Sequence, residues 1–365
     1  MPDYNTKIED LEKELRTTKY NKATQGHIGL VKAKLALLKE KQAGRVQQKT
    51  GKSEHGYSVR KSGDATVLLL GFPSTGKSTL LNKLTDAQSE VAAYAFTTLT
   101  VIPGMMEYKQ AKIQILDVPG IVSGAASGRG RGREVLAVIR NADLVLIIVD
   151  VTQPEQYHAI LREVWESGIR INKTKSEVYI KKTARGGIQI GKTVPLDVEE
   201  ATLARILQEF KINNAEVLIR SVVDVDDFID AIEGNKKYLP AIICVNKVDL
   251  VSVGAAEKVR KELNADILIS AEQNINVGSL KELIYDKLNF IRIYMKEPKK
   301  EADKNVPLIM TKGVTIQDVC TKLHKDFVSR FKFARVWGNS AKFPGQRLML
   351  NHRLQDQDVL ELHGR

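Results

Sequence analysis

The chain has 365 residues, of which 43% are hydrophobic, and a formal net charge of +12. This is long enough to bury a core and form two or more domains, but the longest uninterrupted apolar run, Leu144 to Val149, excludes a membrane span. The charged N-terminus does not read as a signal peptide, and Cys244 and Cys320 are isolated thiols suited to packing. We therefore expect a monomeric, cytoplasmic protein with no membrane contact.

The positive charge is concentrated in two flanks. Between Lys19 and Lys52 there are nine Lys or Arg and one acid, and between Lys299 and Arg353 there are twelve against four. Solvated charged faces would explain either flank alone. Both together favour a polyanionic partner contacted at two places, such as structured RNA or the ribosome.

The N-terminal flank shows helical periodicity. One stripe precedes a break near Gly26 and Gly29 and a second follows it, which predicts a helical hairpin, with a coiled-coil spacer as the alternative. Residues Gln42 to Ser62 then read as a flexible connector. The two stripes are Ile8, Leu11 and Leu15, and Ile28, Val31, Leu35 and Leu38.

A phosphate-binding loop follows the apolar strand Thr66 to Leu70 and precedes a predicted helix. Its glycines allow backbone N–H groups to turn toward phosphate oxygens at the positive end of that helix. In such a loop Lys77 reaches the β and γ phosphates and Ser78 binds Mg²⁺. The expected nucleotide contacts are Gly71, Phe72, Pro73, Ser74, Thr75, Gly76, Lys77, Ser78 and Thr79.

Two further motifs follow predicted strands and concern the nucleotide. Asp117 can hold Mg²⁺ through water, and the amide of Gly120 can face the γ-phosphate. After the strand Ala241 to Val245 come Asn246, Lys247 and Asp249, and the Asp249 carboxylate can accept two hydrogen bonds from guanine. Adenine lacks the matching donors, so GTP is favoured over ATP.

A weaker motif follows the strand Asp266 to Ile269. In this position Ser270, Ala271 and Glu272 match a loop that donates a backbone N–H to the guanine oxygen. The order of the four motifs, each at the carboxyl end of a strand, predicts a doubly wound α/β domain with its ligand at that edge.

The predicted nucleotide domain is interrupted. The strand ending at Val149 and the strand beginning at Ala241 are too far apart for one strand–helix–strand unit of about thirty residues. The intervening α+β module contains a predicted hairpin, with strands around Val178 to Ile180 and Ile188 to Ile190 joined at Gly186-Gly187. A helix from Glu199 to Phe210 follows. The residues do not assign it a function, and packing or a ribosome-facing surface are both allowed.

The C-terminal residues have another pattern. A strand from Val306 to Met310, a helix opening at Thr315 and a final strand from Asp358 to Leu362 predict a small β-grasp module. Its candidate phosphate and stacking contacts are Lys322, Lys325, Arg330, Lys332, Arg335 and Lys342, with Trp337 and Phe343.

These motifs resemble the translation-factor-like GTPases. The segments Ala93 to Thr100, Asp117 to Ile121 and Gly124 to Gly132 are similar to the Obg branch, and specifically to the developmentally regulated GTP-binding protein family, over essentially the whole chain. The resemblance implies an inserted domain and a C-terminal TGS domain. It also implies GTP hydrolysis, ribosome association and a regulatory partner protein, which could contact the TGS domain.

The resemblance implies catalytic roles for Lys77, Thr98 and Gly120. Thr98, with Thr97 as the alternative, is the expected switch threonine on Mg²⁺, and Phe96 begins the segment ordered by the γ-phosphate. Ile121 stands where Ras-like enzymes have a water-orienting Gln, so slow intrinsic hydrolysis is expected. Some relatives bind activating K⁺ through Asn at the position of Ser74, and this departure leaves K⁺ activation open. The arginines at 129, 131 and 133 either supply positive charge to the site or belong to a surface segment that a partner orders.

The expected domains are a basic helical region and linker at 1–60, a GTPase domain at 61–166 and 238–290, an insert at 167–237 and a TGS domain at 291–365. The expected function is a GTP-hydrolysing switch in translation, with GTP or GDP as ligand and Mg²⁺ as cofactor. Two alternatives are an RNA- or ribosome-binding scaffold with GTP as a structural ligand, and a ribosome-assembly GTPase.

Overall fold

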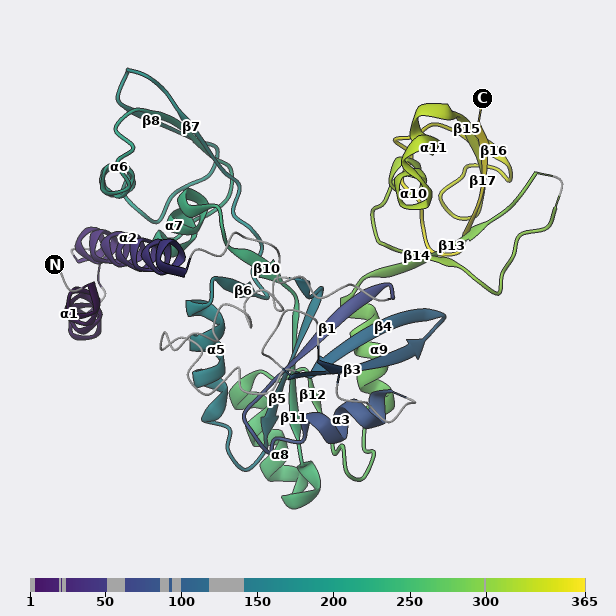
Figure 1. Ribbon diagram of the computed structural model, residues 1–365, viewed down its shortest axis with the longest axis horizontal. Helices are drawn as coiled ribbons and strands as arrows, with labels where there is room; N and C mark the ends of the chain where they lie inside the picture. The colour runs from purple at the N-terminus through teal and green to yellow at the C-terminus, as the bar shows by residue number, and fades with distance from the viewer. Residues whose placement is uncertain are drawn as a thin grey trace. The chain divides into compact units, whose positions relative to one another are not determined.

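The computed structural model describes residues 4–19, 21, 24–50, 63–85, 92–93, 100–117, 141–298 and 300–364. The chain divides into two compact units (Figure 1). Unit 1 contains residues 1–56 and 173–238, and unit 2 contains residues 57–172 and 239–365. No helix among the described residues is long and apolar enough to span a bilayer.

Unit 2 is built on a seven-stranded sheet. Strands β1, β4, β5, β11 and β12 pair in parallel, while β3 runs antiparallel to β4 and to β2. The doubly wound α/β prediction is therefore confirmed. Across the sheet the order is β12 (Ile267–Leu268), β11 (Ala241–Asn246), β5 (Leu144–Asp150), β1 (Ala65–Leu70), β4 (Ala111–Asp117), β3 (Thr100–Tyr108) and β2 (Ala92–Ala93).

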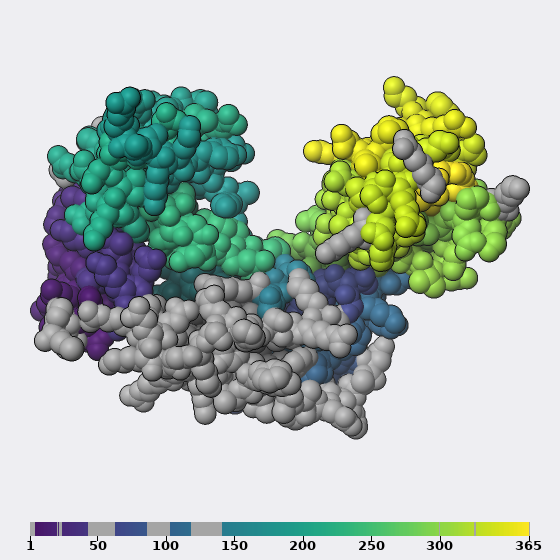
Figure 2. Space-filling view, turned by 45° about the horizontal axis from the view of Figure 1, so that its top comes forward, coloured from purple at the N-terminus to yellow at the C-terminus, as the bar shows by residue number. Residues whose placement is uncertain are grey.

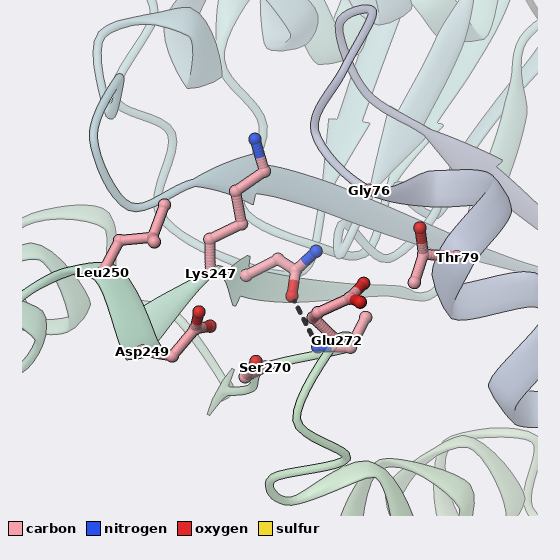
Figure 3. A pocket seen from close by; sticks show the side chains of 9 residues that line it. Gly76, Thr79, Lys247, Asp249, Leu250, Ser270 and Glu272 are labelled. Atoms are coloured by element: carbon pink, nitrogen blue, oxygen red, sulfur yellow. Dashed lines mark hydrogen bonds between the residues drawn. The ribbon is translucent and has the colours of Figure 1, made fainter.

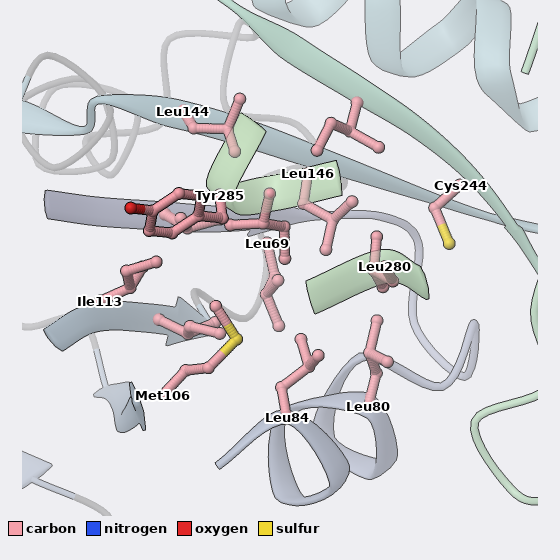
Figure 4. Packing of buried hydrophobic residues seen from close by; sticks show 14 of the residues in the cluster. Leu69, Leu80, Leu84, Met106, Ile113, Leu144, Leu146, Cys244, Leu280 and Tyr285 are labelled. Carbon is pink, nitrogen blue, oxygen red and sulfur yellow. The ribbon is translucent and has the colours of Figure 1, made fainter. Parts of the chain in front are cut away.

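Helices cover both faces of this sheet because its central strands are apolar on both sides. Helices α3 (Lys77–Leu84) and α9 (Val277–Lys287) contribute to one buried cluster, shown in Figure 4, in which Leu80 and Leu280 pack near Leu69. Helices α5 (Gln156–Glu166) and α8 (Val253–Leu263) contribute to the cluster on the other face. The rigid sheet fixes the loops at its carboxyl edge.

Unit 1 joins the N-terminal helices to the insert. Figures 1 and 2 show α1 and α2, in purple, against the teal insert. Ala33 of α2 is fully buried in one cluster with Leu203, Ile206 and Phe228 of the insert. We expected two separate domains at 1–60 and 167–237, but these segments share this core. The elements are α1 (Tyr4–Thr17), α2 (Gln25–Thr50), β7 (Val178–Lys182), β8 (Ile188–Lys192), α6 (Glu200–Glu209), β9 (Ala215–Ile219) and α7 (Val225–Glu233).

The expected β7–β8 hairpin is wrong. In the three-stranded sheet β9 lies between the two strands, antiparallel to β7 and parallel to β8. The alternating residues identify both strands, and Gly186-Gly187 lies between them. The two strands do not pair with each other, because each pairs with β9, which has a buried face. Ala215, Val217 and Ile219 of β9 are all buried. The predicted helix at 199–210 is present as α6.

The connector expected from Gln42 is also partly wrong, because α2 continues to Thr50. The predicted break lies between Thr17 and Gln25, close to Gly26 as expected, and both Gly26 and Gly29 lie within α2. A Cβ on Gly29 would meet Thr202 at 3.3 Å and Ile206 at 3.4 Å. These glycines therefore allow α2 to approach α6 closely.

Part of the basic N-terminal flank is already paired. Lys32 Nζ lies 2.6 Å from Asp226 Oδ2, and Lys39 Nζ lies 2.9 Å from Glu12 Oε1. Lys34 Nζ is 3.9 Å from a carboxylate oxygen of Glu209. These three lysines form ion pairs within unit 1, so the flank offers fewer free charges to a polyanion than its composition indicates.

The C-terminal part of unit 2 is a β-grasp module, as the sequence predicts, and it contains a five-stranded sheet and two helices, the second of which was not predicted. Its core includes Ile293, Val319, Cys320, Val336 and Leu360. Cys320 and Cys244 are both free and buried. The sheet order is β14 (Leu308–Thr311), β13 (Phe290–Met295), β17 (Asp358–Gly364), β15 (Phe331–Trp337) and β16 (Gln346–Leu348), with helices α10 (Ile316–Leu323) and α11 (Lys325–Arg330). The remaining elements are the paired strands β6 (Ile169–Ile171) and β10 (Lys237–Leu239) and the short helix η1 (Val248–Leu250).

Candidate functional site

The loop between β1 and α3 is shaped by its two glycines. A Cβ on Gly71 would lie 2.6 Å from the carbonyl oxygen of Ile148. Gly76 has φ +90°, and a Cβ there would overlap the amide of Asn246. Side chains are thus excluded at both ends of the loop, so its backbone can face a ligand at the N-terminus of α3. Ser74, between them, is exposed and has φ 64°.

Lys77 and Ser78 begin α3. Lys77 Nζ donates to the carbonyl oxygens of Gly71 at 3.0 Å and Phe72 at 2.7 Å, which holds the ammonium within the curve of the loop. Burial lowers the pKa of Lys77 below its ordinary value, and the Asp117 carboxylate partly opposes that shift. The site therefore combines a half-buried cation with loop geometry suited to phosphates.

Ser78 connects this loop to the end of β4. Its Oγ donates to Asp117 Oδ2 at 2.9 Å. Asp117 is 2% exposed, and its Oδ1 is buried without a hydrogen-bond partner among the described residues. A hydroxyl and a carboxylate with an uncommitted oxygen are a suitable donor set for Mg²⁺, directly or through water.

Asn246, the last residue of β11, connects two loops through one side-chain amide. Its Nδ2 donates to the carbonyl oxygen of Thr75 at 2.9 Å, and its Oδ1 accepts from the N–H of Ala271 at 3.0 Å. Figure 3 shows the second of these bonds. Asn246 is 2% exposed, so the phosphate loop and the 270–272 loop are fixed relative to β11.

A pocket of about 270 Å³ opens beside these loops (Figure 3). Asp249 Oδ1 is buried there and has no hydrogen-bond partner among the described residues. A buried, uncommitted carboxylate oxygen fits a ligand with N–H donors, such as the edge of guanine. The pocket is lined by Gly76, Thr79, Asn246, Lys247, Asp249, Leu250, Ser270, Ala271 and Glu272.

The structure brings most of the candidate residues to this edge of the sheet. Phe72 and Thr75 are in the loop, where Thr75 Oγ1 donates to the carbonyl oxygen of Phe72 at 3.0 Å. Pro73 is exposed and is not among the pocket-lining residues. The predictions for Phe96, Thr97, Thr98, Gly120, Ile121 and the arginine-rich segment lie outside the described residues.

The sequence reasoning missed Asp150 and Thr152. Asp150 ends β5, is 7% exposed, and its Oδ2 lies 2.7 Å from Lys247 Nζ. The sequence contains an indication of Asp150, because a carboxylate directly after an apolar strand is expected at the ligand edge of a parallel sheet. Leu250, which lines the pocket, was also missed, because it is an apolar residue just after the motif that ends at Asp249.

Three family models match the chain in succession. They are described as a 50S ribosome-binding GTPase over residues 66–182, the C-terminal region of that domain over 185–290, and the TGS domain over 291–363. An uncharacterized GTP-binding protein of Methanocaldococcus jannaschii is 51% identical over 97% of this chain and 91% of its own length. Human developmentally-regulated GTP-binding protein 2 is 43% identical over 98% of each chain.

The chain belongs to the developmentally regulated GTP-binding protein family. A Dictyostelium discoideum homologue of protein 2 of this family is 44% identical over 98% of each chain. Among solved structures, the G domain of T. maritima FeoB aligns with 61% of this chain and 98% of its own length, at 19% identity and a TM-score of 0.34. As a member of the developmentally regulated GTP-binding protein family, this chain is a GTP-binding GTPase with a TGS domain.

Proposed function

We propose that this GTPase is a nucleotide-dependent switch that acts in translation at the ribosome or another large RNA. The observation that carries the proposal is the hydrogen bond from Ser78 Oγ to Asp117 Oδ2 at 2.9 Å. It links the phosphate loop to the start of the segment that, in GTPases, responds to the γ-phosphate. A change at the phosphates would therefore act on Asp117 through Ser78.

We assign guanine recognition to Asp249. Its buried, uncommitted oxygen supports this role, because a site that leaves a carboxylate unpaired with the wrong base discriminates strongly. Asn246 holds the loops around the base, and Ser270, Ala271 and Glu272 line the same pocket. Lys77 and the amides of residues 71–78 hold the phosphates.

Ser78 and Asp117, with Thr98, would hold Mg²⁺. When bound, Mg²⁺ neutralises charge on the β and γ phosphates. The residues themselves supply positioning and Lys77 supplies positive charge, but Ile121 offers no hydrogen bond to an attacking water. We therefore propose slow intrinsic hydrolysis that a partner accelerates. The exposed Ser74 lacks the amide that coordinates K⁺ in some relatives, so we propose that any K⁺ effect is small.

The C-terminal module is our candidate for the RNA contact. Lys332 and Lys342 are exposed, and Phe343, which follows Lys342 in the sequence, is 59% exposed. Cationic and aromatic side chains together suit a phosphate backbone with unpaired bases. Trp337 is a weaker candidate, since it is half-buried with Lys296 Nζ over its ring.

Single-turnover GTP hydrolysis with and without purified ribosomes tests the proposal. We expect slow hydrolysis by the protein alone and faster hydrolysis with ribosomes, and no hydrolysis by Lys77→Ala under either condition. An unchanged rate with ribosomes, together with GTP-independent co-sedimentation, would instead support a scaffold with GTP as a structural ligand. Acceleration only by immature subunits would support a role in ribosome assembly.

A further inference from the structure

Asp150 is a buried carboxylate beside the base pocket that none of the nucleotide-binding motifs contains. It is in register with Asn246, the last residue of the neighbouring strand β11. Its Oδ1 accepts two hydrogen bonds from Thr152, from the backbone N–H at 2.9 Å and from Oγ1 at 2.7 Å. Its Oδ2 remains for Lys247, whose Nζ lies 2.7 Å away. Both oxygens are thus committed, and Thr152 fixes the orientation of the carboxylate.

The charge of Asp150 is maintained by these partners. Burial alone would raise the pKa of Asp150, but hydrogen bonds from Lys247 and Thr152 outweigh it and leave the pKa below its ordinary value. Asp150 is therefore an anion that holds the Lys247 ammonium at neutral pH.

Lys247 pairs with the carboxylate of Asp150 and is close in the sequence to a second carboxylate, that of Asp249. It has φ 65° and lines the pocket, and in Figure 3 its ammonium end points away from the Asp249 carboxylate. Asp249 is only two residues further along the chain, and its buried Oδ1 has no hydrogen-bond partner among the described residues. An ammonium within reach of such an oxygen would pair with it unless a stronger partner held it elsewhere.

We propose that Asp150 is a positioning residue for base selectivity: it captures the Lys247 ammonium and so keeps the Asp249 carboxylate free for guanine. The inference rests on the proposed role of Asp249. Without the charge at 150, Lys247 turns to Asp249, and the carboxylate that should accept the guanine N1–H and 2-amino group is already occupied. Asp150 thus acts on the base without touching it.

The measurement is the ratio of Kd values for ITP and GTP, which differ only by the 2-amino group. Because both ligands share ribose and triphosphate, the ratio is insensitive to a partial loss of folded protein. We expect Asp150→Asn to lower the preference for GTP over ITP by about tenfold, the scale of one hydrogen bond to a charged group. Asp143→Asn is the matched control, because Asp143 precedes β5 at the opposite end of the strand, where its Oδ2 accepts from Thr66 N–H at 2.9 Å. Its ratio should equal that of the wild type.

A double-mutant cycle tests whether the effect acts through Lys247. Lys247→Met keeps an unbranched stem against the pocket but removes the ammonium. In that background Asp150→Asn should change the ratio by less than about twofold. The same loss in both backgrounds would overturn the inference, as would an unchanged ratio in Asp150→Asn alone. A wild-type protein without a GTP preference over ITP would instead refute the proposed role of Asp249.

Discussion

In the candidate site, the carboxylate oxygens Asp117 Oδ1 and Asp249 Oδ1 are buried without a hydrogen-bond partner among the described residues. A buried acceptor without a donor costs about 1–3 kcal/mol. A ligand that supplies the donor recovers this cost, whereas one without it does not. The selectivity of the site therefore depends on single atoms.

Asp249→Asn should change the preferred base. The amide can donate to the 2-oxo group of xanthine, which the carboxylate repels, but it accepts poorly from the guanine 2-amino group. We expect GTP affinity to fall by about tenfold or more and XTP affinity to rise. Competition binding measures both. Asp249→Ala is the control, since it should lose GTP without gaining XTP, and an unchanged GTP preference in Asp249→Asn would contradict the assignment.

Gly76→Ala should prevent nucleotide binding. Gly76 combines φ +90° with a Cβ position that overlaps the Asn246 amide, so the loop must shift and break the bond to Thr75. Thermal unfolding and GTP titration measure the effect. Gly254→Ala is a matched control, because a Cβ there meets open space and alanine favours the helix α8 by up to about 1 kcal/mol. Normal GTP binding by Gly76→Ala would show that the loop tolerates a side chain.

Single residues differed in how well the sequence indicated them. Lys77, Ser78 and Asp249 stand in motifs with fixed spacing, and strand ends at one edge of a sheet bring such motifs together. Asp150 has no motif, and its partner Lys247 is nearly a hundred residues away in the sequence. Its pairing depends on the register of β5 with β11, which periodicity does not give.

At the scale of elements, the contact of α2 with α6 restricts which residue can occupy position 29. A Cβ on Gly29 would lie 3.4 Å from Ile206 and 3.6 Å from Val225. A helix this close to its neighbour has no space for a large side chain. Glycine therefore occurs here although it lowers the stability of the helix itself.

Gly29→Leu should therefore destabilise unit 1. Overpacking a well-filled interface costs about 1–3 kcal/mol, and the lost glycine offsets less than about 1 kcal/mol of it. Hydrogen exchange of residues 173–238 would measure the change. Glu40→Leu adds the same side chain at an exposed position of α2 and should leave exchange unchanged. Equal protection in both variants would mean that α2 does not support the insert.

Elements were predicted well where one face is apolar over a continuous stretch, as in α6, whose Leu203, Ile206 and Leu207 are fully buried. The β7–β8 pairing was wrong because alternation identifies strands but not their partners. The turn glycines at 186 and 187 connect two strands that never pair, and a third strand 23 residues further on decides the order.

At the scale of the whole molecule, the N-terminal helices are part of a folded unit rather than a basic arm. Residues 4–50 supply Ala33, Ile28 and Val31 as buried side chains, and Lys32 pairs with Asp226 of the insert. The sequence indicates an apolar face on these helices, but this pattern does not show which part of the chain packs against that face.

Removing residues 1–50 should therefore affect the insert more than the nucleotide site. We expect faster hydrogen exchange at residues 173–238, because the truncation uncovers their core, while GTP affinity stays within about twofold of the full chain. A triple variant, Lys32→Gln with Lys34→Gln and Lys39→Gln, is the control for charge alone and should change exchange much less. If the truncated chain keeps full protection in the insert, the shared core is not needed for its stability.

The two segments of unit 1, residues 1–56 and 173–238, are synthesised at different times. Lys32 and Asp226 are 194 residues apart, and at ordinary synthesis rates α2 leaves the ribosome roughly ten seconds or more before its partner helix. During that interval the apolar stripe of α2 lacks the insert residues against which it packs. The phosphate-binding loop is also synthesised before those residues. A nascent chain arrested before residue 215 would lack β9, so the apolar faces of α1 and α2 would be available to chaperones. Unit 1 would then fold only after the insert is complete, although its first helices are synthesised at the start.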